Sequence, residues 1–127
     1  MSSSAILGKI NEVKKEIDKC KDLKSLISSI IDPLNDIVTK FYSAAEKLQT
    51  GLSVGGNTPD KGNTKEIADE IKSLIAQFNE SIIEIDKKIQ NLDVDLEYLN
   101  QEYRDALARE AWEWEQRKKQ EEAKNNK

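Results

Sequence analysis

The side chains that most often carry out chemistry in proteins are scarce in this chain. It has no histidine, which excludes histidine acid–base catalysis, Ser-His-Asp triads and histidine-ligated zinc. Its one cysteine, Cys20, excludes an intramolecular disulfide and a CxxC site. Cys20 also falls in an apolar row with helical spacing, where we expect a small buried hydrophobic side chain rather than a nucleophile.

Two segments carry only part of a ligand-binding motif. In residues 56–64, Lys61 precedes the glycine at position 62, which is the reverse of the order in a phosphate-binding loop. Residues 93–97 carry acids at alternate positions, as at the start of a calcium loop, but Arg104 stands where such a loop needs its bidentate acid. We therefore expect no enzymatic activity, no cofactor and no metal site.

The overall charge and hydropathy restrict the class of partner. The 127 residues include 20 Lys and Arg against 24 Asp and Glu, which gives a formal charge of −4. Domains that bind nucleic acid are normally basic, so we expect no nucleic-acid partner. No apolar run is long enough for membrane insertion, and the first residues lack the basic and apolar parts of a cleaved signal peptide. We expect a protein that is cytoplasmic when made.

Loop-forming residues are concentrated in one place. Residues 50–63 contain four of the five glycines and Pro59, whereas both flanks carry apolar residues at steps of three and four. The sequence predicts an all-α fold in a single domain, residues 1–127. This domain is an antiparallel two-helix hairpin with helices over about 4–49 and 64–122, a loop over 50–63 and a frayed C-terminal tail.

Two local features of these helices follow from single residues. Asn63, with Glu66 three positions later, has the spacing of a capping box and is the predicted N-cap of the second helix. Pro33 interrupts the first apolar row. Because proline lacks an N–H donor and clashes with the preceding turn, we expect the first helix to be kinked or broken near this residue.

Each predicted helix carries one long apolar row. The row of the first helix is Ile6, Ile10, Val13, Ile17, Cys20, Leu23, Ile27, Ile30, Leu34, Ile37, Phe41, Ala45 and Leu48, with Leu26, Ile31, Val38 and Ala44 beside it. The row of the second helix is Ile67, Ile71, Leu74, Phe78, Ile82, Ile85, Ile89, Leu92, Leu96, Leu99, Tyr103, Leu107, Ala111 and Trp114. A lone hairpin has no enclosed core, so we expect a second chain to complete a three- or four-helix bundle.

The candidate partner interface is drawn from these rows and from two tryptophans near the C-terminus. Trp112 and Trp114 lie about 200° apart on a helix, so one partner helix cannot cover both. The candidates are Ile27, Ile30, Leu34, Ile37, Phe41, Leu74, Phe78, Ile82, Ile85, Ile89, Leu92, Leu96, Leu99, Trp112 and Trp114.

The layout resembles a family of small α-helical proteins encoded beside LXG-domain toxins of the Gram-positive type VII secretion system, which are similar to WXG-type secreted proteins. The segment Ala44-Ala45-Glu46-Lys47-Leu48-Gln49-Thr50-Gly51-Leu52, followed by Gly55-Gly56 and Pro59-Asp60-Lys61-Gly62, looks like the loop region of that family. The turn has Leu52-Ser-Val-Gly55 where WXG proteins have Trp-x-Gly. Tyr98-Leu-Asn-Gln-Glu102 matches the family's YxxxD/E export pattern, and its i,i+4 spacing puts both side chains on one helix face.

The resemblance implies a non-enzymatic targeting factor. Such a protein would bind the helical N-terminal domain of an LXG effector, with a second small helical protein as a further possible partner, and would leave the cell with that effector. Tyr98 and Glu102 would then contribute to the export signal. The alternative is a self-associating coiled-coil scaffold, which would be a homo-oligomer.

Overall fold

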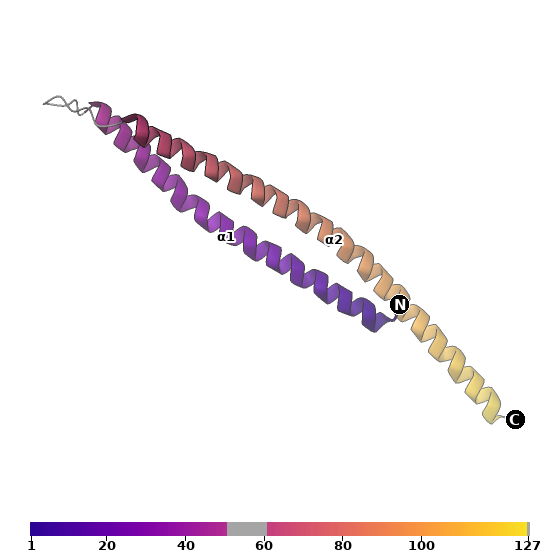
Figure 1. The fold of residues 1–127 in the computed structure, drawn as a ribbon. Coiled ribbons are helices and arrows are strands. Elements are labelled where there is room, and N and C mark those ends of the chain that lie inside the picture. Colours follow the sequence, from indigo (N-terminus) through magenta and orange to yellow (C-terminus); the bar gives the residue numbers. More distant parts are fainter. Residues whose placement is uncertain (51–60, 127) are drawn as a thin grey trace. The chain divides into compact units, whose positions relative to one another are not determined.

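The structure, a computed structural model, describes residues 1–50 and 61–126, and these residues form two helices. Helix α1 spans Ser3–Thr50 and helix α2 spans Lys61–Asn125. The helices pack against each other, and the described residues contain no strand (Figure 1). The predicted all-α hairpin is therefore confirmed. Most of the predicted loop, from position 51 to position 60, lies outside the described residues.

The beginning of α1 has its backbone donors satisfied. Ser2 Oγ accepts a hydrogen bond from the N–H of Ala5 at 3.2 Å, as an N-cap serine does. The N–H and Oγ of Ser3 both donate to the carboxylate of Glu110, at 2.8 and 2.7 Å. Nearby, a guanidinium N–H of Arg109 donates to the carbonyl of Met1 at 2.8 Å. One end of α1 is thus held by side chains of α2 that lie about a hundred residues away in sequence.

Two local predictions concern the start of α2 and the middle of α1. Helix α2 already begins at Lys61, so Asn63 lies inside its first turn and is not the N-cap. The predicted start of α2 is three residues late, because the spacing of a capping box occurs by chance inside a helix as well as at its end. Helix α1 continues through Pro33 without a break. Proline removes only one backbone hydrogen bond, and the half-buried Ile31 and Leu34 pack on either side of it.

The contacts divide the chain into two compact units. The first unit contains Met1–Cys20 and Lys88–Lys127, and the second contains Lys21–Lys87. In the first unit Ile6, Ile10 and Ala106 form a buried cluster, and Leu96, Leu99 and Tyr103 pack against it. In the second unit the buried side chains are Val38, Ala45, Ala68 and Ile75. No large side chain among the described residues is fully buried, as expected for paired helices without a third layer.

The predicted apolar rows depart from the buried rows in the second unit. On α2, Ile75 is 6% exposed whereas the predicted Leu74 is 42% exposed. The row that faces α1 begins at Ala68 and continues through Ile71, Ile75 and Phe78 in steps of three and four. The predicted row stepped three residues from Ile71 to Leu74, whereas the row that faces α1 steps four residues to Ile75. Steps of three and of four both keep a row on one face of a helix with 3.6 residues per turn, so the spacing alone does not choose between these two neighbours.

Candidate partner-binding surface

Helix α1 carries an apolar stripe that α2 does not cover. Leu23, Leu26, Ile30 and Ile37 belong to the second unit and are between 39% and 59% exposed. Their spacing is three, four and seven residues, and Pro33 fills the missing step. Such spacing is that of positions a and d in a heptad. We call these four residues the α1 outer stripe, which is about 21 Å long at 1.5 Å per residue.

The outer stripe is continuous with the hairpin contact. Ile27, Leu34 and Phe41 occupy the neighbouring heptad position and are half-buried. Val38 and Ala45 are buried one step further around the helix. The apolar surface of α1 is therefore wider than the strip that α2 covers. Such a wide apolar face is typical of a helix with two neighbours rather than one.

The predicted candidates on α1 are therefore divided between two faces. Ile30 and Ile37 lie in the exposed stripe, whereas Ile27, Leu34 and Phe41 border the hairpin contact. The candidate list omitted Leu23 and Leu26, which are more exposed than either isoleucine. The signal that could have found them is the seven-residue repeat of positions 23, 30 and 37, with 26 and 33 between them.

Most of the α2 residues that were predicted to bind a partner are half-buried in the hairpin. Leu74 is exposed and Leu92 is buried. The remaining six are half-buried: Phe78, Ile82, Ile85, Ile89, Leu96 and Leu99. Exposed apolar residues of α2 that the candidate list omitted are Ile83, Val94 and Leu107. Between positions 74 and 94 this helix therefore presents single exposed apolar residues rather than a stripe.

Three polar side chains near the outer stripe have partners within the helix or on α2. The hydroxyls of Ser29 and Thr39 donate to the carbonyls of Leu26 and Asn35, at 2.6 and 3.0 Å. Lys24 forms an ion pair with Asp86 of α2 at 2.8 Å. A hydroxyl that donates to its own helix loses little when another chain excludes water around it. These side chains are compatible with a covered face.

The predicted export pair lies in the first unit. The Tyr98 side chain is exposed and hydrogen-bonds the carboxylate of Glu102. This hydrogen bond, together with the nearby negative charge, raises the pKa of Tyr98, so the phenol stays protonated. The two side chains therefore meet on one face of α2, as their i,i+4 spacing predicts.

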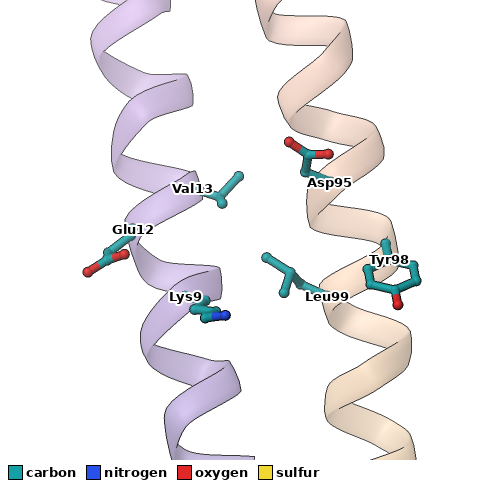
Figure 2. Close-up of a pocket in the computed structure, with 6 residues that line it drawn as sticks. All are labelled: Lys9, Glu12, Val13, Asp95, Tyr98 and Leu99. Carbon is teal, nitrogen blue, oxygen red and sulfur yellow. The ribbon is translucent and has the colours of Figure 1, made fainter. Parts of the chain in front are cut away.

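Beside this pair, a groove of about 390 Å³ runs between α1 and α2. It is lined by Lys9, Glu12, Val13, Asp95, Tyr98 and Leu99. Figure 2 shows Val13 and Leu99 facing each other across the space between the two helices. The other lining side chains are charged or carry a hydroxyl, so the groove floor is apolar and its rim is polar.

The last turns of α2 carry both tryptophans of the chain. Trp112 and Trp114 are 62% and 57% exposed, so α1 covers neither of them. The ammonium group of Lys118 lies 5.2 Å from the centre of the Trp114 ring, within the range of a cation–π contact. Trp114 was expected to continue the apolar row of α2, but the structure leaves it in solvent.

The described residues hold neither a metal-binding group of three or more acids and cysteines nor a helix apolar enough to cross a bilayer.

The hydroxyl of Tyr42 on α1 hydrogen-bonds the carboxylate of Asp69 on α2, which raises the pKa of Tyr42. This contact joins the two helices of the second unit.

Comparison with family models, curated proteins and solved structures gives no match for this chain.

Proposed function

We propose that this protein is a non-enzymatic targeting factor that binds the helical N-terminal domain of an LXG effector of type VII secretion. The α1 outer stripe is the observation that supports binding to a further helix. Burying a leucine or isoleucine side chain completely contributes about 1.5–3 kcal/mol, and much of that contribution is not realised in the hairpin alone. A third helix packed on the stripe would realise it.

The effector is the partner that the family resemblance favours. Its N-terminal domain is helical, and a helix can pack along the α1 outer stripe side by side with α1. In this proposal the chain is made in the cytoplasm and leaves the cell in complex with its effector. A second small helical protein can join the same bundle.

The test of binding is co-expression of the full chain with the N-terminal domain of the LXG effector encoded beside it. We expect the two chains to co-elute from a size-exclusion column. The double variant Leu26→Gln/Ile30→Gln should fold, because both side chains are exposed, but should lose the complex. Ile83→Gln is the matched control, since it alters an exposed aliphatic residue of the same unit away from the stripe. Absence of a complex with the unmodified chain would contradict the proposal.

The test of export concerns Tyr98 and Glu102. In the proposal this pair, in which Tyr98 is exposed and Glu102 is half-buried, forms part of the signal that the secretion machine recognises. Tyr98→Ala should therefore lower the amount of effector in the culture medium. Co-elution with the effector should be unchanged. Glu97→Gln, at a neighbouring exposed acid, is the control. Unchanged export in Tyr98→Ala would exclude this pair from the signal.

A self-associating scaffold is the second candidate function. The heptad spacing of the α1 outer stripe suits a copy of this chain as well as another protein. Sedimentation of the purified chain separates the two candidates. A well-defined homo-oligomer would support the scaffold, whereas a chain that gains stability only with the effector domain would support the targeting factor.

A further inference from the structure

One side of the α1 outer stripe carries acidic and small residues. In the heptad that places Leu23, Ile30 and Ile37 at position a, position g is occupied by Asp22, Ser29 and Asp36. All three of these residues are exposed. No lysine or arginine occurs from position 25 to position 39. The flank of the stripe that faces away from α2 therefore carries an aspartate near each end and no basic residue between them.

Lys24, the one basic residue between positions 22 and 39, lies away from this flank. Lys24 is at position b, on the α2 side of α1, where it pairs with Asp86. Neither Asp22 nor Asp36 forms an ion pair among the described residues. The stripe ends where lysines appear at its own d positions, at Lys19 and Lys40. The acidic flank and the apolar stripe thus have the same extent along α1.

This charge pattern disfavours a second copy as the occupant. In an antiparallel pair of identical helices, the g flanks of the two chains come together, which would bring Asp22 of one chain near Asp36 of the other. In a parallel pair, each g flank meets an e flank, which here holds Ile27, Leu34 and Phe41 and no basic residue. In neither orientation does a flanking e or g position place a basic residue against Asp22 or Asp36, and flanking charges decide partner choice in paired helices.

We propose that the α1 outer stripe binds an amphipathic helix of a different protein, whose own apolar seam is flanked by lysine or arginine facing Asp22 and Asp36. This inference rests on the proposed function for the existence of a helical partner and adds the chemistry of that partner. Basic residues on the partner would align it along α1 and speed its association, while the aliphatic seam would supply most of the affinity.

The experiment uses the full chain and two synthetic three-heptad helical peptides as probes. Both peptides have isoleucine at a and leucine at d. One carries lysine at every e and g position, and the other carries glutamate there. Binding is measured by isothermal titration calorimetry at low and at high salt. We expect the lysine peptide to bind at least about tenfold more tightly than the glutamate peptide, with a preference that shrinks as salt screens the charges.

Charge-reversed variants test whether the preference for the lysine peptide arises from the flank of the α1 outer stripe. Asp22→Lys/Asp36→Lys should reverse it, so that the glutamate peptide binds more tightly. Glu80→Lys/Glu84→Lys adds the same charge to the same unit at exposed positions on α2, and it should leave the preference in favour of lysine. Leu26→Gln/Ile30→Gln should weaken both peptides.

Three results would overturn the inference: no peptide binding, an equal change of preference in the two charge-reversed variants, or a homodimer of the unmodified chain that Leu26→Gln/Ile30→Gln dissociates. The peptides contain no effector sequence, so these results are independent of co-elution with the LXG domain. A chain that binds that domain but shows no lysine preference would retain the proposed function and lose only this inference.

Discussion

At the scale of single residues, Glu110 is the side chain with the clearest electrostatic role. Its carboxylate accepts hydrogen bonds from both the N–H and the hydroxyl of Ser3, and these bonds lower the pKa of Glu110. A helix leaves its first N–H groups without partners inside the helix, so a carboxylate at this place also interacts favourably with the helix dipole. Glu110 therefore acts as a cap for α1 that is supplied by α2.

This lowered pKa predicts a pH dependence of stability. A carboxyl group whose pKa is lower in the folded chain stabilises it above the ordinary glutamate pKa of about 4.3, and this contribution disappears as the pH falls through the lowered value. Glu110→Gln should therefore lower the thermal midpoint at pH 7, and the difference from the unmodified chain should shrink as the pH falls below the ordinary glutamate pKa. Circular dichroism melts at a series of pH values measure the difference.

The control for this prediction is Glu113→Gln, which removes the same charge one turn further along α2 at an exposed position. It reports what a change of net charge does by itself. If Glu110→Gln differed from the unmodified chain by the same amount at pH 3 and pH 7, the carboxylate form of Glu110 would have no special role in capping α1.

At the scale of the elements, Pro33 lies in the middle of a continuous helix. It leaves the carbonyl of Ser29 without its usual N–H donor, and its ring crowds the same turn. The helix persists because the residues on either side pack against α2. Pro33 also occupies one d position of the α1 outer stripe, where its ring presents an apolar surface without a long side chain.

Replacing this proline should strengthen α1. Pro33→Ala restores one backbone hydrogen bond, and we expect it to raise the free energy of unfolding by up to about 3 kcal/mol. Urea unfolding followed by circular dichroism measures the change. Asn35→Ala, at an exposed position of the same segment, should change stability by less than about 0.7 kcal/mol. A Pro33→Ala variant no more stable than Asn35→Ala would mean that the helix accommodates the proline without cost.

The sequence determined the two helices well because apolar periodicity depends on local geometry. It placed their ends within three residues of the observed ones, at Ser3, Thr50, Lys61 and Asn125. It predicted the rows that contain the buried Ile6, Ile10, Ile17 and Leu92, but it chose Leu74 in place of Ile75. Steps of three and of four both fit a helix with 3.6 residues per turn, so the periodicity does not decide between two adjacent aliphatic residues.

The contacts between distant residues were also beyond sequence reasoning. The bonds from Ser3 to Glu110, and from Tyr42 to Asp69, depend on how the two helices are aligned within each unit. Many acids are spaced suitably along α2, and the sequence does not distinguish among them. The same limit applies to the α1 outer stripe, because Leu23 and Leu26 become identifiable as exposed only when the side of α1 that faces α2 is known.

At the scale of the whole molecule, the hairpin has little apolar surface removed from water for its length. Among the residues whose burial the structure describes, nine hydrophobic side chains are buried, and three of them are alanines. With a core of this kind, the free energy of folding of the lone chain depends on many half-buried contacts. A bound helix would contribute a free energy of comparable size. Partner binding and folding should therefore be strongly coupled.

This coupling can be measured as a shift in the unfolding transition. Adding the effector's N-terminal domain at a hundred times the dissociation constant should stabilise the chain by about 2.7 kcal/mol, because the partner binds only the folded form. Hydrogen exchange of α1 amides, compared with and without the domain, measures the effect. The Leu26→Gln/Ile30→Gln variant should show no added protection, and equal protection in that variant would place the binding surface elsewhere.

The two exposed tryptophans at the end of α2 allow binding to be followed by intrinsic fluorescence. Since Trp112 and Trp114 are the only tryptophans and both already lie in water, unfolding should change their emission wavelength little. A ligand that covers the last turns of α2 would shift the emission to the blue, whereas one confined to the α1 outer stripe would leave it unchanged. A single fluorescence titration can therefore indicate which of these two surfaces a binding protein occupies.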